Sequence, residues 1–460
     1  MSRSFRFGSA AAVFVAGAPL ALMAAIPGAA IGSIAATGGA VPFSHALARH
    51  AFVTPPTTAD CVASIGIACY SPAQFQQAYN LGPLYAGGWT GKGKTVAVVD
   101  SFGNPKAAAD LATFDKAFGL PAPPSFKIIQ PAGVVPPFNP NDPVMANWAI
   151  ETNLDVQYAH AMAPGANILL VETPVAETEG VTGFPEIIQA ENYVIAHHLA
   201  DVISQSFGAT EQTFPTTQAL LNLRSAYKAA AKADVTVLAS SGDTGATNYT
   251  LSGASVYLHR AVGWPASDPL VTGVGGLQYF LDATGNQTQP AAVWNDTSLL
   301  GSLASGSGGL SVIFSRPGYQ NSVANRVGAQ RGVPDISLSA AVNGGALVYL
   351  RKSALLPSDG FYIIGGTSEA SPEFAGVVAI ADQVAGHDLG LINPALYKLS
   401  ASHAAGLVDI TAGTNTVTFV QGGTNHTVLG FDARVGYDLS SGVGGIDGAA
   451  FVPELVAADS

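Results

Sequence analysis

Between Thr95 and Ala239 the sequence alternates short apolar segments with longer helical ones, and this alternation limits the fold more than any other feature. The apolar segments predict buried strands at Thr95–Asp100, Phe126–Gln130, Asn167–Glu172, Val202–Ser206 and Val235–Ala239. Helices are predicted between them at Ala107–Phe118, Val144–Met162, Glu186–His198 and Thr217–Lys232. Buried strands joined by helices form right-handed βαβ units, so we expect an α/β protein with a mainly parallel central sheet flanked by helices. Such sheets bind ligands beyond the carboxyl ends of their strands.

The composition supports a large core and argues against a nucleic-acid partner. The chain has 460 residues, of which 48% are hydrophobic and only 11% charged, with a net charge of −12. Proteins that bind a phosphate backbone need basic clusters, and we find none here. There is also no internal repeat and no second domain of comparable size, so residues 71–460 are expected to form one domain.

The N-terminus has the order of a secretory signal. Met1–Arg6 is basic and an apolar run follows to about Ala30, with small-residue cleavage positions near Ala30 or Ala36. We therefore expect a signal peptide at residues 1–36 and a secreted, extracellular protein. The alternative is an uncleaved membrane anchor, since the run is long enough to span a bilayer.

Residues 37–70 are rich in Ala, Pro and Thr without a clear period, which predicts a leader or linker. Cys61 and Cys69 are the only cysteines of the chain. In an exported protein this spacing predicts a disulfide that closes a small loop; the alternative is two unpaired thiols. Two cysteines alone do not make a structural zinc site.

The stretch Gly365–Pro372 presents a serine between a predicted strand, Gly360–Ile364, and a predicted helix, Glu373–Ala385. Pro372 is expected in the first turn, where a helix tolerates proline. Ser368 would then lie where helical N–H groups converge, an environment that stabilises the negative charge of an acyl-transfer intermediate. The alternative is an ordinary Ser or Thr N-cap.

Two acids share one face of the predicted helix Val144–Met162. Glu151 and Asp155 are four residues apart, Trp148 is on the same side, and no Lys or Arg occurs from Val144 to Val171. The two carboxyl groups either face solvent or share a proton in a cleft. A shared proton raises one pKa and gives a group that can act as base or acid.

A third acid, Asp243, lies in Ser240–Gly245, directly after the predicted strand Val235–Ala239. This is the crevice end of the sheet, where a carboxyl group can point at a substrate. The alternative is an Asx-turn, in which the side chain binds its own backbone.

Asp100 ends the first predicted strand, as an aspartate does in subtilisin-like proteases, and Gly366–Ser368 resembles their serine motif. None of the nine histidines has the His-Gly-x-His context of a catalytic histidine. His160 is nearest in position but lies near the end of its helix. A Ser-His-Asp triad is therefore not expected.

Together these motifs resemble the sedolisin family, the serine-carboxyl peptidases, which have a subtilisin-like fold but use Glu and Asp in place of His. The resemblance runs from Pro72 to Val452. It is carried by the Glu-x-x-x-Asp helix, the Ser-Gly-Asp-x-Gly segment and the Gly-Thr-Ser-x-x-x-Pro segment. Lesser matches occur at Val202–Gly208, Trp264–Ser267, Gly308–Ser311 and Val333–Ile336.

The resemblance implies a role for each acid. Ser368 would attack the scissile carbonyl, Glu151 would accept its proton, and Asp155 would orient Glu151. A protonated Asp243 would donate a hydrogen bond to the oxyanion, which favours acidic pH because only a neutral carboxyl group donates. Asp100 stands where many members have Glu and would extend the carboxyl network.

The resemblance also implies one Ca²⁺ site near the C-terminus. Asp409 and Asp438 would supply carboxylates, and Ile410, Arg434 and Gly436 backbone carbonyls, a ligand set that suits Ca²⁺. The family usually has Gly at the position of Arg434, whose cationic side chain would weaken binding. The alternative is two aspartates that only stabilise turns.

These observations predict a secreted, monomeric serine-carboxyl endopeptidase that acts on proteins or peptides at acidic pH. An alternative is a catalytically inactive sedolisin-like binding or surface protein; another is a transferase or esterase on the same scaffold. Two departures from the family are visible: only about 70 residues precede the match, where most members have a large prodomain, and Phe207 stands where Trp is common.

Overall fold

The computed structural model describes residues 45–46 and 51–459. The predicted signal peptide, residues 1–36, lies outside the described residues, as do residues 37–44 and 47–50 of the predicted leader. Within the described part, no helix has both the length and the apolar character needed to cross a membrane.

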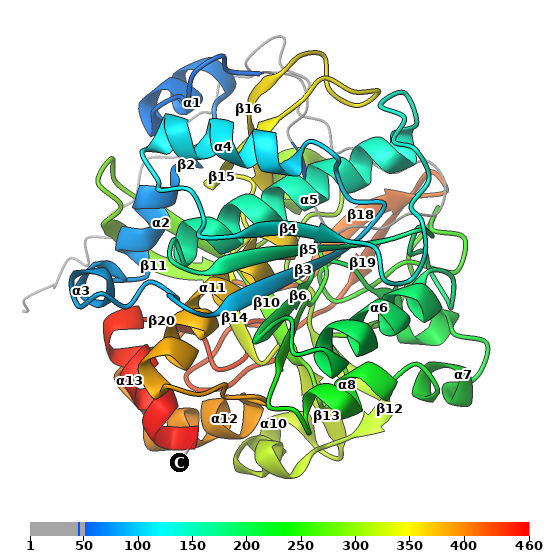
Figure 1. Cartoon of the computed structure of the whole chain (residues 1–460). Helices are drawn as coiled ribbons and strands as arrows, with labels where there is room; N and C mark the ends of the chain where they lie inside the picture. Colours follow the sequence, from blue (N-terminus) through cyan, green and yellow to red (C-terminus); the bar gives the residue numbers. More distant parts are fainter. Residues whose placement is uncertain (1–44, 47–50, 460) are drawn as a thin grey trace, which may run out of the picture. The chain divides into compact units, whose positions relative to one another are not determined.

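The central sheet has eight strands in the order β11-β10-β8-β6-β3-β5-β4, with β14 also paired to β10 (Figure 1). All neighbours are parallel except β10 and β11. This confirms the predicted α/β fold with a mainly parallel sheet in a single domain. The strands are β3 (Thr95–Ser101), β4 (Phe126–Ile129), β5 (Asn167–Thr173), β6 (Val202–Gln205), β8 (Thr236–Ser240), β10 (Thr272–Leu281), β11 (Gln287–Val293) and β14 (Ile336–Ser339).

Helices cover both faces of this sheet, as strands that are apolar on both sides require. Along β3, Val96 and Val98 pack into one core cluster, and Ala97 and Val99 pack into another. The first cluster includes residues of α4 (Ala107–Phe118), α5 (Pro143–Met162) and α11 (Thr367–Ala385). The second includes residues of α6 (Phe184–Ala196) and α8 (Ser225–Ala230) (Figure 1).

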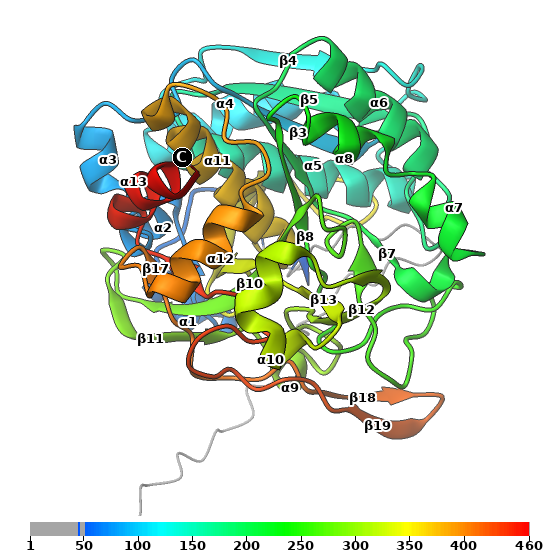
Figure 2. The ribbon, with the colours of Figure 1, turned by 90° about the horizontal axis from the view of Figure 1, so that it is seen from below.

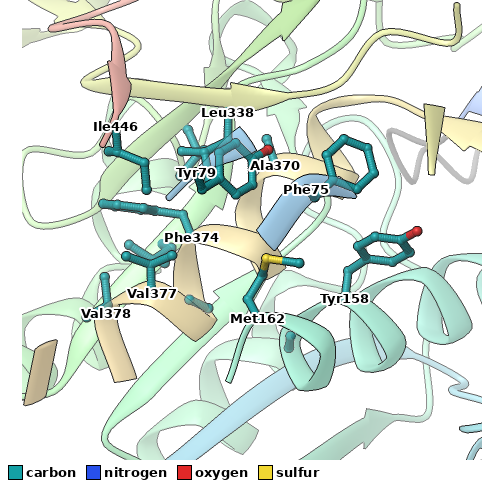
Figure 3. Close-up of a cluster of buried hydrophobic side chains, with 14 of the residues drawn as sticks. Phe75, Tyr79, Tyr158, Met162, Leu338, Ala370, Phe374, Val377, Val378 and Ile446 are labelled. Atoms are coloured by element: carbon teal, nitrogen blue, oxygen red, sulfur yellow. The ribbon is translucent and has the colours of Figure 1, made fainter. Parts of the chain in front are cut away.

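Helix α11 runs through the middle of the first cluster and is buried from Thr367 to Asp382. Figure 3 shows Phe374, Val377 and Val378 of this helix packed among side chains from other elements. Helix α13 (Gly448–Asp459) packs against it, and α12 (Asn393–Ser402) packs against α13 (Figure 2). A helix that is enclosed on all sides has a fixed position, so residues at its start are held rigidly.

A second sheet has the order β1-β16-β15-β2, and its strand β16 (Gly360–Gly365) leads into α11. The other strands are β1 (His45–Ala46), β2 (Cys69–Tyr70) and β15 (Gly345–Leu350). β15 and β16 are antiparallel, so the strand before Ser368 does not belong to the parallel sheet.

Part of the predicted leader or linker has regular structure. Thr58–Ile65 forms α1, and Cys69 and Tyr70 pair with β15. The predicted disulfide between Cys61 and Cys69 is confirmed, and both residues are buried against the second sheet. The absence of a clear sequence period does not show this, because the pairing partner lies about 275 residues away.

The prediction of one continuous helix at Thr217–Lys232 is wrong, because the segment forms two helices, α7 (Thr217–Leu221) and α8. In the turn between them, the Arg224 guanidinium donates two hydrogen bonds to the buried carboxylate of Asp268. This tertiary contact accompanies the interruption.

Smaller elements complete the described chain, and one hairpin, β18–β19, reaches out from the rest (Figure 2). They are α2 (Pro72–Ala78), α3 (Gly82–Ala86), α9 (Thr297–Leu300), α10 (Ala324–Val327), β7 (Ala209–Thr210), β9 (Gly263–Trp264), β12 (Gly309–Ser315), β13 (Gln330–Val333), β17 (Leu407–Val408), β18 (Val417–Gln421), β19 (Thr424–Val428), β20 (Gly445–Ile446) and the 3₁₀ helices Glu211–Thr213 and Gly318–Val323.

Candidate active site

Ser368 is the second residue of α11, directly after a sharp turn. The preceding Gly366 has φ 131°, a conformation that side-chain-bearing residues rarely adopt, and it is the N-cap of the helix. The alternative interpretation of Ser368 as an ordinary N-cap is therefore wrong. Its hydroxyl donates to the carbonyl oxygen of Ser206 at 3.5 Å.

The predicted position of Pro372 in a first helical turn is wrong. The helix begins at Thr367, so Pro372 is its sixth residue. Proline has no N–H, and the carbonyl group of Ser368, four residues earlier, lacks its usual helical donor. The Ser206 hydroxyl lies 3.4 Å from that carbonyl oxygen and can replace the missing donor when it is not donating to Asp155.

Glu151 and Asp155 are both fully buried in α5, so the alternative interpretation, in which the two carboxyl groups face solvent, is wrong. Asp155 Oδ1 accepts a hydrogen bond of 2.9 Å from the Ser206 hydroxyl. Burial raises the pKa of Asp155 well above its usual range, and the charges of Asp100 and Glu151 raise it further. Three carboxyl groups thus influence one another next to the residue that contacts Ser368.

Asp100, at the end of β3, is fully buried and has no cation beside it in the described structure. Burial raises its pKa to about 7, while the Thr152 hydroxyl lowers the pKa and the charge of Glu172 raises it. At acidic pH this group is protonated, and it can share hydrogen bonds with other carboxyl groups.

Asp243 contacts the residue just before Ser368. Its Oδ1 accepts hydrogen bonds of 2.8 Å from both the backbone N–H and the hydroxyl of Thr367. The Asx-turn interpretation is wrong, because the Gly245 N–H that would close the turn bonds the Ser305 carbonyl instead. Burial raises the pKa of Asp243 well above its usual range, although the Thr367 donors lower it. Both donors occupy Oδ1, so a proton on this carboxyl group belongs on Oδ2.

His160 does not join this group. It is buried near the end of α5, where its Nε2 lies 2.7 Å from the Pro121 carbonyl oxygen and 3.4 Å from Asp115. Burial lowers the pKa of His160, which disfavours its protonated form. The position of this histidine agrees with the prediction that no Ser-His-Asp triad forms.

Two further acids on α11, Glu369 and Glu373, were not singled out from the sequence. Both are fully buried, and Glu373 Oε2 accepts a hydrogen bond of 2.5 Å from the Tyr79 hydroxyl. The signal was present, since two acids four residues apart in an apolar helix cannot both be surface residues when the helix is apolar on every side.

The two parts of the predicted calcium site contact the same loop. Asp409 accepts hydrogen bonds from the Gly436 N–H, and Asp438 Oδ2 accepts one from the Arg434 N–H. Asp438 Oδ1 also accepts four hydrogen bonds from Ser440 and Ser441, as a turn-stabilising aspartate does.

Carbonyl ligands from Ile410, Arg434 and Gly436 stay a prediction. In the described part of the chain, no three His, Cys, Asp or Glu side chains are grouped as metal ligands. A hollow lined in part by Asp438 is also lined by three arginines, Arg260, Arg326 and Arg434. The carboxylates of Asp409 and Asp438 suit a hard cation, and the nearby hollow combines the three arginines with Asp432 and Asp438.

Comparisons with known proteins agree with this fold and site. Residues 142–437 match the model of the subtilase family. The chain is 30% identical over 395 residues to kumamolisin of Bacillus sp. (strain MN-32), covering 84% of this chain and 64% of that protein. It is 29% identical over 380 residues to sedolisin of Pseudomonas sp. (strain 101), covering 82% of this chain and 60% of that protein.

A solved structure of Pseudomonas sedolisin, a serine-carboxyl proteinase complexed with pseudo-iodotyrostatin, superposes with a TM-score of 0.70 at 27% identity. The match covers 85% of this chain and 99% of the solved one. The chain belongs to the subtilase family. Within that family, its relatives and the shared structure place it among the sedolisins.

Proposed function

We propose that this chain is a serine-carboxyl endopeptidase that cleaves proteins or peptides through an acyl-enzyme on Ser368. One observation carries the proposal: Asp155, through Ser206, and Asp243, through Thr367, both connect to the turn that holds Ser368. A nucleophile with buried carboxyl groups on two sides, whose hydrogen bonds in the described structure go to Ser206 and not to a histidine, suits acyl transfer by carboxyl groups.

In the proposed reaction, the Ser368 hydroxyl attacks the carbonyl carbon of the scissile bond while Glu151 accepts its proton. Asp155 holds Glu151 in place and shares its charge. The amine leaving group takes the proton back from Glu151, which leaves an ester on Ser368. Water then attacks the ester by the same steps, with Glu151 again transferring the proton.

The oxyanion would receive hydrogen bonds from a protonated Asp243 and from the Ser368 N–H. Asp243 donates only while it is neutral, and its raised pKa extends the pH range in which it keeps its proton. Acidic conditions therefore favour the proposed reaction, and deprotonation of Asp243 would remove a donor worth about 10²–10³ in rate.

The chain spans less than two thirds of the length of the curated relatives described above. Their activity therefore does not transfer directly, and endopeptidase action is proposed here for this chain. The runner-up, an inactive binding protein, is disfavoured because all four positions hold side chains of the required types. Secretion to the outside of the cell and a monomeric state complete the proposal.

The test is cleavage of a denatured protein from about pH 2.5 to 8 by the unchanged protein and by Ser368→Ala and Glu151→Gln. Each variant should lose at least about 10³-fold in kcat, as removal of a nucleophile or base does in other hydrolases. Ser371→Ala is the matched control, since this serine lies one turn later on the same helix and bonds Ser204 instead. Full activity in Ser368→Ala, or none in the folded unchanged protein, would contradict the proposal.

A structural Ca²⁺ ion is proposed for Asp409 and Asp438, where it would stabilise the loop 434–438 without taking part in catalysis. Asp409→Asn should then lower Tm in calcium buffer and remove the difference between calcium and chelator. Asp438→Asn is less diagnostic because its hydrogen bonds stabilise the turn with or without a metal. An equal Tm with calcium and with chelator in the unchanged protein would contradict a calcium site.

A further inference from the structure

The helix that carries Ser368 also carries a pair of buried acids, Glu369 and Glu373. They are four residues apart, so they occupy neighbouring positions on one side of α11. Both are fully buried, and neither has a Lys, Arg or His partner among the described residues. Two carboxyl groups in such a place are stable only while they hold at least one proton between them.

Tyr79, which follows α2, connects this pair to the central sheet. Its hydroxyl donates to Glu373 Oε2 at 2.5 Å and accepts from the Ser339 N–H at 2.9 Å. Figure 3 shows Tyr79 beside Leu338 of β14 and Ala370 of α11. The tyrosine thus bridges the nucleophile helix and the end of strand β14.

The same strand end holds the other side of the turn. The Gly366 N–H donates to the carbonyl oxygen of Ala340, the residue after Ser339, at 2.7 Å. Ser368 therefore lies between two attachments to one short backbone segment, through Gly366 before it and through Glu373 and Tyr79 after it. If either attachment is lost, the first turns of α11 can shift relative to the sheet.

The titratable groups that face the pair are all acids or phenols, and the Ser339 hydroxyl and the Ala346 N–H, which lower the pKa of Glu369, are neutral. The titratable groups are Tyr79, Tyr158 of α5, Tyr279 of β10 and, near Glu369, Asp243. The Tyr79 hydroxyl can stabilise one negative charge on the pair. A second charge would meet no cation and would be repelled by the first, so the two carboxylates would separate or draw in water.

We propose that Glu369 and Glu373 are positioning residues that hold the Ser368 turn against β14 while they share a proton, and release it when both are ionised. The device concerns the conformation of α11 and does not depend on peptidase activity. Burial raises the pKa of both groups well above the usual range, and the charge of Glu373 raises that of Glu369, so the release belongs to the alkaline side.

The test is amide hydrogen exchange of the segment 366–380 from pH 4 to 9, corrected for the intrinsic rate. In the unchanged protein, protection of this segment should fall at least tenfold as pH rises. The reason is that an opening which releases one proton becomes up to tenfold more favourable with each unit of pH increase. The double variant Glu369→Gln/Glu373→Gln, which cannot ionise, should keep its protection within about threefold over the same range.

The matched control is Glu191→Gln. Glu191 is also fully buried, and burial raises its pKa to about 8, but it lies on α6 in the other core cluster. This control should change global stability while the pH-dependent loss of protection at 366–380 remains. If the control also abolished that loss, or if the double variant lost protection as the unchanged protein does, the proposal would be wrong.

Tyr79→Phe keeps the test decisive if the double variant does not fold. It removes the bridge without adding or removing an acid, so protection of 366–380 should drop severalfold already at pH 5. Unchanged protection in a folded Tyr79→Phe protein would overturn the proposed attachment.

Discussion

Ser206 contacts the candidate site at three points. Its hydroxyl lies 2.9 Å from Asp155 Oδ1 and 3.4 Å from the Ser368 carbonyl oxygen, and its own carbonyl oxygen accepts from the Ser368 hydroxyl. A hydroxyl group has one proton, so it donates to one of the two oxygens at a time. When Asp155 is protonated it can donate to Ser206, which frees the Ser206 proton for Ser368.

Ser206→Ala should therefore lower kcat about tenfold with little change in KM, because the buried hydrogen bond that its hydroxyl donates, worth about 1 to 1.5 kcal/mol, is lost. It should also raise the pKa of Asp155 further, since the Ser206 donor lowers that pKa. The measurement is kcat as a function of pH. Ser204→Ala is the control, because Ser204 lies two residues earlier in β6 and bonds Ser371; an equal loss in both variants would argue against a special role of Ser206.

Asp100→Asn should flatten the pH dependence of stability. The folded-state pKa of Asp100 is about 7, above the usual 3.8, so its favourable contribution is complete below pH 3.8 and is lost as pH rises towards 7. About three units correspond to about 4 kcal/mol. Urea unfolding at pH 4 and pH 7 should show a smaller difference for the variant; an unchanged difference would mean that Asp100 does not take up a proton on folding.

At the scale of elements, α11 and α13 offer a natural comparison. Each has a proline as its sixth residue, Pro372 and Pro453, which removes one helical N–H. In α11 the affected carbonyl belongs to Ser368, whereas in α13 it belongs to Ala449, far from the candidate site in sequence. The same defect is therefore placed once at the nucleophile and once elsewhere.

Pro372→Ala would restore an N–H for the Ser368 carbonyl and compete with Ser206. We expect equal or higher Tm but a several-fold lower kcat, because the Ser206 contact is no longer needed by the helix. Pro453→Ala should affect Tm similarly and leave kcat unchanged. Thermal unfolding and kinetics of both variants provide the measurement, and a kcat that falls equally in both would exclude a specific effect at Ser368.

Much of the element pattern was predictable because buried strands and helices leave strong local patterns. Strand β3 and helix α5 match the predicted segments to within one residue. The start of α11 was placed six residues too late, since Pro372 ordinarily marks a helix start and the replacement donor, Ser206, is 162 residues away in sequence. The break after α7 was not predicted for the same reason, because Asp268, which binds Arg224 in the break, is 44 residues away in sequence.

The candidate site was predictable as a set of residue types and not as a set of contacts. Ser368, Glu151, Asp155 and Asp243 were identified by local motifs. The bond between Asp243 and Thr367 joins residues 124 positions apart, and no local pattern predicts it. The same applies to Tyr79 and Glu373, which are 294 positions apart.

At the scale of the whole molecule, many buried acids have a raised pKa and few buried bases oppose them. Burial raises the pKa to about 7 or 8 for Asp100, Asp115, Glu179, Glu191 and Asp382. His160 acts in the opposite direction, because its lowered pKa makes protonation costly at acidic pH. The balance favours an acid-stable fold.

The free energy of unfolding should therefore be greatest at acidic pH and fall between about pH 5 and 8. Groups with raised pKa contribute fully below their unfolded values and lose that contribution as pH rises, by about 1.4 kcal/mol per pH unit for each proton. We expect a slope steeper than that of a single group, measured by urea unfolding at several pH values. A stability maximum at neutral pH would contradict this balance.

The bond from Asp243 to Thr367 has a consequence for motion within the site. Thr367 is covalently joined to Ser368, so the carboxyl group proposed to receive the oxyanion is tied to the backbone next to the nucleophile. When a bound chain pushes this turn, both groups are displaced together and their separation is preserved. Movement of the turn therefore changes the position of both groups but not the distance between them. Little reorganisation energy is then needed when negative charge develops on the substrate oxygen.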